Sequence, residues 1–217
     1  MSRTVDIGVL LSGGGTNLQA IVDGIQQQRV DARIRTVISN KEQAYGIIRA
    51  RDHGIPTRVL NHRDFPSREA YDEVLVRHLK ESAVELVVLA GFMRLLSPLF
   101  IRSFPNRIMN IHPALLPAFP GLRVQAQALE YGVRFAGCTV HFVSEECDKG
   151  PIILQAVVPV LPDDTEVSLS ERILAQEHRI FPMAIQLYSE DRLRVEGRRV
   201  WIEDSSADGN VAWINPA

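Results

Sequence analysis

The chain has 217 residues, of which 46% are hydrophobic and 23% are charged, a composition typical of one globular domain with a sizeable core. Its formal net charge of −2 argues against partners held by bulk electrostatics, such as nucleic acid or an anionic membrane surface. No apolar run approaches the roughly 18 residues of a membrane span, no secretory signal opens the chain, and the two cysteines imply no disulfide framework. We therefore expect a single cytoplasmic domain over residues 1–217.

The first predicted element is a buried strand over Val5–Leu11, followed by the glycine-rich loop Ser12–Asn17 and then by a helix. The helix is indicated by apolar residues at the i, i+3, i+4, i+7 spacing, namely Leu18, Ile21, Val22 and Ile25. Glycines let backbone N–H groups approach an anion, and the start of a helix adds partial positive charge. The loop is thus predicted to bind a phosphate; the alternative is a tight turn that requires positive φ.

This loop favours a monophosphate ester over ATP or a dinucleotide. No lysine follows the glycines, as a Walker A motif would require. The next predicted strand, Ile34–Ser39, ends in Asn40 and Lys41, so it lacks the acidic residue that binds a ribose hydroxyl in dinucleotide folds.

The alternation of strands and helices continues through the N-terminal half. The predicted elements are a helix over Tyr45–His53, a strand over Ile55–Leu60, a helix over Ser67–Ser82, a strand over Leu86–Leu89, a helix that starts at Ser97-Pro98 and a strand that leads into Asn110. Repeated strand–helix units with short links predict an α/β fold with a mostly parallel central sheet and helices on both faces.

Two polar residues, Asn110 and His112, lie at the carboxyl end of the last of these strands, which the following prolines terminate. Their two-residue spacing points both side chains to the same face of the strand. The amide can donate to a developing oxyanion, and the imidazole can move a proton near neutral pH. We interpret the pair as a candidate catalytic site; the alternative is that both side chains satisfy backbone groups at a tight turn.

After Gly121 the sequence becomes richer in strands. The predicted elements are a brief helix over Gln125–Glu130, strands over Cys138–Val143 and Ile152–Val160, a helix over Val167–Glu190 kinked at Pro182, a hairpin of Leu193–Glu196 with Arg199–Ile202, and a loose tail over Asp204–Ala217. The loop between the two strands carries Asp148 beside a glycine and a proline. Its carboxylate could face His112 and relay protons through water; the alternative is a solvated turn aspartate.

Two other chemistries find no support in the sequence. Cys138, His141 and Cys147 do not have the spacing of a zinc site, and the first two would point to opposite faces of a strand. A serine nucleophile would need a Gly-x-Ser-x-Gly elbow, which the chain lacks. We therefore expect neither a metal nor a nucleophilic serine.

Four motifs occur in the order seen in the folate-dependent formyltransferases: Ser12–Gln19, Leu89–Arg94, Asn110–Pro117 and Asp148–Pro151. The chain resembles that family from about Val5 to about Trp201, and its glycine loop resembles the branch that acts on phosphoribosylglycinamide. The resemblance implies transfer of a formyl group from 10-formyltetrahydrofolate to the amine of phosphoribosylglycinamide in purine biosynthesis. It implies small-molecule partners with no nucleic acid or membrane, and leaves monomer and homodimer open.

The resemblance also implies a Rossmann-like formyltransferase fold with a β-rich C-terminal part of the sheet. The N-terminal half would bind the phosphoribosyl substrate, and the C-terminal half would contribute the folate pocket. By motif, the catalytic trio is Asn110, His112 and Asp148. The substrate-binding residues are Gly15, Thr16, Asn17, Leu174, Ala175, Gln176 and Glu177. The folate-binding residues are Arg68, Met93, Arg94, Leu95, Leu96, Asn110, Ser144, Glu145, Glu146, Cys147 and Asp148.

The sequence departs from the family pattern at three places. Ala114 stands where a serine is common, Lys149 replaces a frequent glycine, and the segment 123–125 lacks a histidine often found there. The trio is untouched. Two alternatives remain open, a formyltetrahydrofolate hydrolase that uses water as the acceptor and a non-catalytic phosphosugar-binding module. A methionyl-tRNA formyltransferase would need a further RNA-binding domain and more positive charge.

Overall fold

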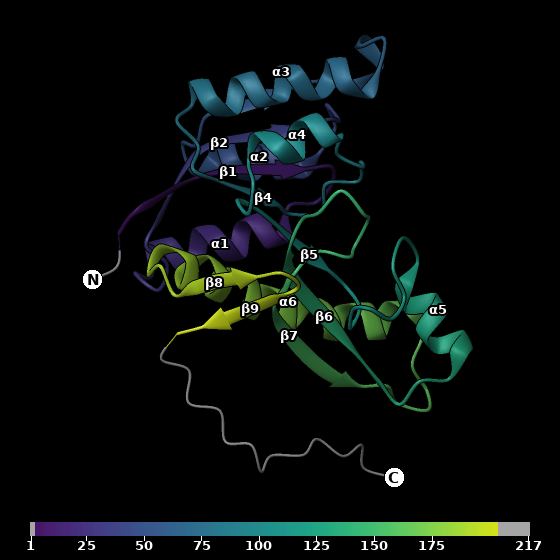
Figure 1. The fold of residues 1–217 in the computed structure, drawn as a ribbon. Helices are drawn as coiled ribbons and strands as arrows, with labels where there is room; N and C mark the ends of the chain where they lie inside the picture. Colours follow the sequence, from purple (N-terminus) through teal and green to yellow (C-terminus); the bar gives the residue numbers. More distant parts are fainter. Residues whose placement is uncertain (1–2, 204–217) are drawn as a thin grey trace.

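The structure is a computed structural model that describes residues 3–203, so the predicted tail Asp204–Ala217 lies outside the described residues. The strands are β1 (Val5–Leu11), β2 (Ala32–Ser39), β3 (Thr57–Val59), β4 (Leu86–Leu89), β5 (Ile108–His112), β6 (Phe135–Phe142), β7 (Ile152–Pro159), β8 (Leu193–Glu196) and β9 (Arg199–Ile202). The helices are α1 (Thr16–Gln26), α2 (Tyr45–Asp52), α3 (Arg68–Glu81), α4 (Pro98–Ser103), α5 (Val124–Tyr131) and α6 (Glu166–Ser189), with a short 3₁₀ helix, η1, at His62–Asp64. Within residues 3–203 the strands form one sheet in the order β3-β2-β1-β4-β5-β6-β7-β9-β8 (Figure 1).

The N-terminal half of the sheet is parallel. Strands β3, β2, β1, β4 and β5 all run in one direction, which confirms the prediction of a mostly parallel sheet. Strand β4, in the middle of this half, is a continuous apolar run in which every residue is buried, because both of its faces are covered. Parallel strands end at the same edge, so the loops that follow β1, β4 and β5 are brought together.

Two hydrophobic clusters lie on opposite faces of this half. Val9 and Leu11 of β1 point into one cluster with residues of α1, α2 and α6, whereas Leu10 points into the other with residues of α3 and α4. This alternation is the period-2 geometry of a strand. Figure 1 shows α3 and α4 on one side of the parallel strands and α1 on the other, so the predicted helices on both faces are confirmed.

The sheet changes direction at β6, which pairs antiparallel with β5 and with β7. Strand β6 begins at Phe135, earlier than the predicted start at Cys138, because Phe135 and Ala136 pair with the end of β7. Gly137 is required in this strand, since a Cβ there would lie 2.0 Å from the carbonyl oxygen of Ala156. The β-rich C-terminal part is therefore a continuation of the same sheet.

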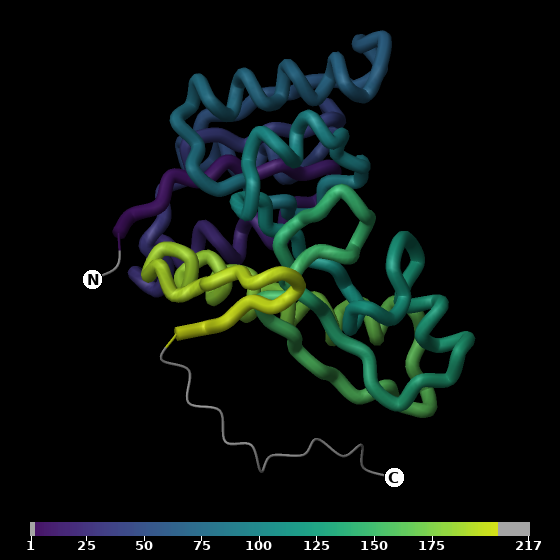
Figure 2. The backbone as a smooth tube through the Cα atoms, in the orientation of Figure 1, coloured from purple at the N-terminus to yellow at the C-terminus, as the bar shows by residue number. Residues whose placement is uncertain are grey.

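The last two strands, β9 and β8, form the end of the sheet beyond β7. Helix α6 continues through Pro182 over 24 residues, and the predicted hairpin forms from β8 and β9 around Gly197, which has a φ of 60°. Figures 1 and 2 show this hairpin and α5 at opposite ends of the C-terminal half. Among the described residues, no helix is both long enough and apolar enough to cross a membrane.

Candidate active site at the carboxyl ends of the parallel strands

The glycine loop after β1 is hydrogen-bonded to helix α2. The N–H of Gly46 donates to the carbonyl of Gly13 over 3.0 Å, and the Arg49 guanidinium donates to the carbonyl of Gly14 over 2.9 Å. Gly15, which precedes α1, has a φ of 71°, and a Cβ there would lie 2.5 Å from Cα of Gly46. Only glycine fits this turn. Gly13 and Gly14 are exposed. An anion can therefore approach the loop on the side away from α2, next to the start of α1 at Thr16.

Two predicted substrate residues that are 160 positions apart meet beside this loop. Asn17 Nδ2 donates to Glu177 Oε2 over 2.7 Å, and both side chains are buried. Burial raises the pKa of the Glu177 carboxyl above its ordinary value, and the hydrogen bond from Asn17 opposes that shift. The Asn17 oxygen has no hydrogen-bond partner within the described residues. An acceptor without a partner beside a buried carboxyl group is suited to a hydroxyl-bearing ligand.

The neighbouring residues of α6 are more open. Ala175 is exposed, and Leu174 and Gln176 are partly buried. Leu174 lines a shallow groove on the outer side of the helix, and Gln176 accepts a hydrogen bond from Arg179. Of the four residues predicted in this segment, Glu177 is therefore the one that points into the interior.

The segment after β4 is tied to the glycine loop through Ser12. Ser12 Oγ accepts from the N–H of Met93 over 2.9 Å and donates to Asn40 Oδ1 over 2.6 Å. Met93 and Leu95 then project into solvent, with 62% and 61% of their surfaces exposed. Apolar side chains left exposed beside a polar loop are typical of a wall that a ligand covers.

Two arginines lie at the margin of this wall. The Arg94 guanidinium stacks over the Tyr71 ring at 5.1 Å, and Leu96 packs against the cluster on the α3 side of the sheet. Arg68 begins α3, is exposed and pairs with Glu69 at 3.3 Å. Helix α3 is anchored to the wall by Asp72, whose carboxylate accepts from the N–H of Ser97 over 2.6 Å. Burial raises the pKa of the Asp72 carboxyl, and the nearby charges of Arg94 and Arg68 oppose that shift, so Arg68 lies near the 93–96 segment.

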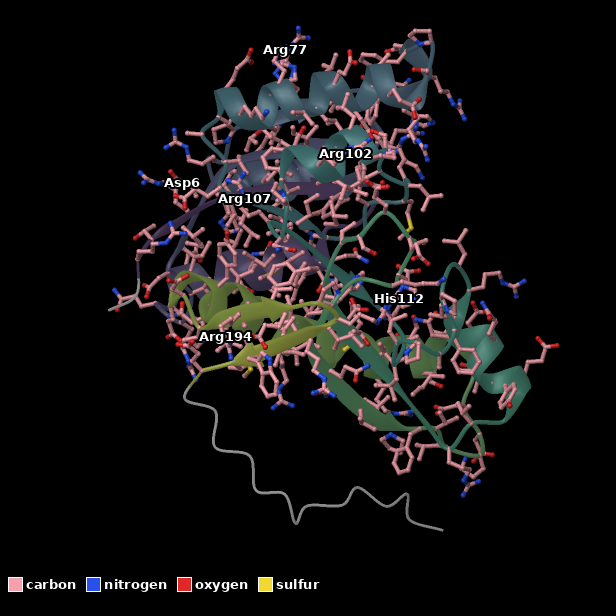
Figure 3. All side chains as sticks on the ribbon, viewed as in Figure 1. Asp6, Arg77, Arg102, Arg107, His112 and Arg194 are labelled. Atoms are coloured by element: carbon pink, nitrogen blue, oxygen red, sulfur yellow. The ribbon has the colours of Figure 1, made fainter. Side chains whose placement is uncertain are left out.

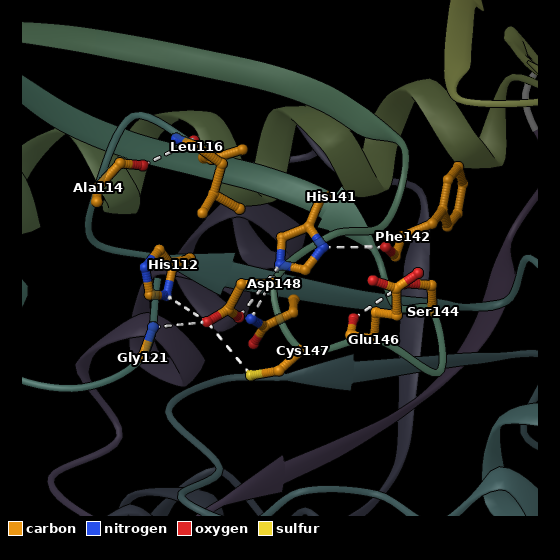
Figure 4. Close-up of polar contacts among 12 residues, drawn as sticks. His112, Ala114, Leu116, Gly121, His141, Phe142, Ser144, Glu146, Cys147 and Asp148 are labelled. Atoms are coloured by element: carbon orange, nitrogen blue, oxygen red, sulfur yellow. Dashed lines mark hydrogen bonds and ion pairs between the residues drawn. The ribbon is translucent and has the colours of Figure 1, made fainter. Parts of the chain in front are cut away.

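Asn110 and His112 stand at the end of β5, where the parallel half meets β6. His112 is nearly buried, and its Nε2 lies 2.9 Å from the carbonyl oxygen of Phe119. A carbonyl accepts and does not donate, so the ring carries a proton on Nε2. Its Nδ1 then faces Asp148 Oδ2 at 3.7 Å (Figure 4). Figure 3 shows His112 toward the middle of the molecule, whereas Arg77 and Arg194 lie at its periphery.

Asp148 is positioned by its backbone as well as by its neighbours. It has a φ of 53°, and its Oδ2 accepts from the N–H of Gly121 over 2.9 Å and from Cys147 Sγ at 3.4 Å. Only 11% of its side chain is exposed. The rest of the loop is more open: Ser144 donates to the carbonyl of Glu146, Glu146 pairs with Lys149 at 2.6 Å, and Glu145 is exposed. The structure therefore brings the predicted trio together and leaves the 144–147 segment at its rim.

A buried threonine holds the proline-rich segment after His112. Thr139 Oγ1 donates to the carbonyl of Ala114 over 2.7 Å and accepts from the N–H of Leu116 over 3.1 Å. This clamp fixes the path of the chain toward Phe119, whose carbonyl orients His112.

His141 is a site residue that the sequence reasoning missed. It lies opposite Asn110 in the antiparallel register of β5 and β6, and its Nε2 is 3.2 Å from Asn110 Nδ2 and 4.0 Å from Asp148 Oδ1. The available signal was the alternation of Thr139 and His141, two polar residues on one face of an otherwise apolar strand. Without the register, that alternation did not indicate which strand His141 would face.

Among residues 3–203, no group of three or more His, Cys, Asp or Glu side chains is arranged to hold a metal ion. The family model described as formyl transferase matches residues 5–185. The chain belongs to the formyl transferase family. Members of this family take their formyl group from a folate-derived donor and act on small-molecule substrates.

The relatives of this formyl transferase family member fall into two size classes. It is 46% identical over 199 residues to phosphoribosylglycinamide formyltransferase of Escherichia coli, covering 92% of this chain and 94% of that protein. It is 54% identical over 190 residues to the trifunctional purine biosynthetic protein adenosine-3 of Drosophila pseudoobscura pseudoobscura, covering 87% of this chain but only 14% of that protein. The chain therefore spans a small part of the multifunctional relatives that it matches.

The fold agrees with solved structures. The crystal structure of glycinamide ribonucleotide transformylase 1 from Symbiobacterium toebii has a TM-score of 0.91 and 56% identity, covering 93% of this chain and 95% of that one. Phosphoribosylglycinamide formyltransferase from Coxiella burnetii, solved in complex with CHES, has a TM-score of 0.89 and 40% identity, covering 93% and 94% of the two chains. The predicted formyltransferase fold is confirmed.

Proposed function

We propose that this chain transfers a formyl group from 10-formyltetrahydrofolate to the amino group of phosphoribosylglycinamide, a step of purine biosynthesis. One observation carries the proposal: a phosphate-type glycine loop and an Asn110–His112–Asp148 cluster open at the same edge of the sheet. The first suits a phosphoribosyl group, and the second suits acyl transfer. The names of the relatives that cover both chains almost fully support the same reaction.

The phosphoribosyl end of the substrate would occupy the glycine loop. Backbone N–H groups around Gly15, Thr16 and Asn17 would receive the phosphate at the start of α1. Residues 174–177 of α6 would contact the remainder of the ribonucleotide, with Glu177 accepting from a hydroxyl group. Because Asn17 and Glu177 already bond to each other, both halves of the chain would contribute to this side of the site.

The folate would lie on the opposite side of the trio. The exposed Met93 and Leu95 would cover its ring system, with Arg94 and Leu96 continuing that wall and the 144–148 loop forming the other. Arg68, which is exposed at the start of α3, would meet the glutamate tail, whose carboxylates an arginine pairs with well.

The chemistry would be direct acyl transfer between the two substrates. The substrate amine attacks the formyl carbon, and the carbonyl oxygen becomes an oxyanion in a tetrahedral intermediate. The Asn110 amide donates to that oxyanion. A protonated His112 ring, whose Nε2 lies by the Phe119 carbonyl and whose Nδ1 faces Asp148, stabilises the oxyanion by its positive charge. Asp148, 3.7 Å from the His112 ring, stabilises the imidazolium. The intermediate then collapses as the bond between the formyl carbon and the folate nitrogen breaks, and the proton lost by the amine passes through Asp148 and water to that leaving nitrogen.

The test compares the reaction of the formylated folate with and without the ribonucleotide acceptor. Purified protein is mixed with 10-formyltetrahydrofolate, with and without phosphoribosylglycinamide, and the change in folate absorbance is followed. Turnover that requires the ribonucleotide supports the transferase. Equal turnover without it would identify a formyltetrahydrofolate hydrolase, and ligand binding without turnover would identify a phosphosugar-binding module.

A further inference from the structure

His141 is a buried polar side chain beside the trio, and both of its ring nitrogens have neighbours. Its side chain is 2% exposed. Nδ1 lies 2.9 Å from the carbonyl oxygen of Phe142 (Figure 4), and Nε2 lies 3.2 Å from Asn110 Nδ2. The charged or titratable groups that face the ring are Asp148, with Oδ1 at 4.0 Å from Nε2, and His112.

These contacts determine where the His141 ring carries its proton. A carbonyl oxygen only accepts, so the ring N–H is on Nδ1 and donates to Phe142. Burial lowers the pKa of His141 below its ordinary value, against the opposing effects of Phe142 and Asp148. The ring is therefore neutral near pH 7, and its Nε2 offers a lone pair and no proton.

A lone pair at Nε2 admits one orientation of the Asn110 carboxamide. The NH2 group can donate one hydrogen to Nε2, whereas the flipped amide would set its carbonyl oxygen against the same lone pair. In the allowed orientation the second N–H of Asn110 has no hydrogen-bond partner within residues 3–203. That free hydrogen is the donor that the proposed reaction assigns to the oxyanion.

We propose that His141 is a positioning residue for formyl transfer, which acts as a fixed hydrogen-bond acceptor that orients the Asn110 amide with its NH2 group toward the reacting oxygen. This inference rests on the proposed function for its kinetic consequences, but the orientation itself is a property of the free protein. A second role for His141 as a proton donor to Asp148 is disfavoured, because the neutral ring has its only proton on Nδ1, directed away from the carboxylate.

The kinetic test is a double-mutant cycle on wild-type and variant chains. His141→Ala should lower kcat about tenfold or more, since Asn110 loses its orientation, while KM for phosphoribosylglycinamide stays within about twofold. His141→Gln supplies an amide oxygen that can accept from Asn110, and should recover much of the loss. In the Asn110→Ala background, His141→Ala should cost almost nothing further, because the group it orients is absent.

A merely structural role gives different results. If His141 only supports packing, its loss and the loss of Asn110 multiply, and His141→Gln is no better than His141→Ala; either result would overturn the proposal. Melting temperatures of all variants show whether each is folded.

A spectroscopic measurement on the free protein separates this inference from the proposed function. The nitrogen NMR spectrum of the His141 ring should show a proton on Nδ1 and none on Nε2 at about pH 7 to 8. A proton on Nε2 in that range would refute the positioning role, even if the protein is an active transferase. Absence of ribonucleotide-dependent turnover in the wild type, with the Nδ1 tautomer present, would instead refute the proposed function.

Discussion

Replacing Asp148 by asparagine removes one negative charge from beside the His112 ring while keeping the shape of the side chain. At the observed 3.7 Å, a pair of unit charges interacts by about 4.5 kcal/mol with an effective dielectric constant of 20, and by about 1 kcal/mol if fully screened by water. Because only 11% of the Asp148 side chain is exposed, the larger figure is the better guide. We expect kcat to fall by about 10² to 10³.

The substitution isolates the charge because the local fold accepts it. Asp148 has a φ of 53°, a conformation that asparagine adopts as readily as aspartate and alanine does not. The asparagine carbonyl can still accept from the N–H of Gly121, as the carboxylate does. The melting temperature of Asp148→Asn should therefore change little.

The assay measures kcat and KM for both substrates by initial rates. The charge matters most when the ring is protonated in the transition state, so the loss should appear in kcat and leave both KM values nearly unchanged. Asp52→Asn, an equal charge change at an exposed position at the end of α2, serves as the matched control and should retain wild-type kcat. A folded Asp148→Asn enzyme with kcat within about threefold of wild type would show that Asp148 does not support a charged His112.

Three further predictions follow from the same contacts. His112→Ala should lower kcat by about 10² or more in a protein whose circular dichroism spectrum is unchanged; undiminished turnover would remove His112 from the chemistry. Gly15→Ala should lower the free energy of unfolding by about 1–3 kcal/mol because of the positive φ at this position, and by more because the new Cβ would clash with Cα of Gly46. Gly13→Ala, where a Cβ meets nothing within 4 Å, is the control and should have the melting temperature of the wild type. Glu177→Gln should raise KM for the ribonucleotide about tenfold or more and should also alter the pH dependence of stability. The pKa of the Glu177 carboxyl is raised in the folded state by burial, so this group favours folding at a pH below its unfolded pKa, and that contribution is lost as the pH rises through the folded pKa. Glu177→Gln should therefore be more stable than the wild type near pH 7 but not near pH 4. Equal melting curves of the two proteins at both pH values would contradict the burial argument.

The local patterns of the sequence determined the architecture of the parallel half. Each feature depends only on neighbouring residues of the sequence. This holds for the first buried strand, the glycine turn at Gly15, the amphipathic helix that follows, and the strand end that carries Asn110 and His112. Period-2 and period-3.6 patterns report burial directly, and glycine and proline mark where elements stop. These features need no knowledge of what the element packs against, so they could be predicted without a structure.

Only the tertiary structure decided which side chains meet. The bond between Asn17 and Glu177 joins positions 160 apart, and the approach of Asp148 to His112 depends on how the loop after β6 folds back over the 113–121 segment. His141 was missed because its partner is set by the antiparallel register of β5 and β6, and a shift of one residue would turn it to the other face of the sheet. Register is fixed by the packing of both faces and by long-range hydrogen bonds, which no local stretch of sequence contains.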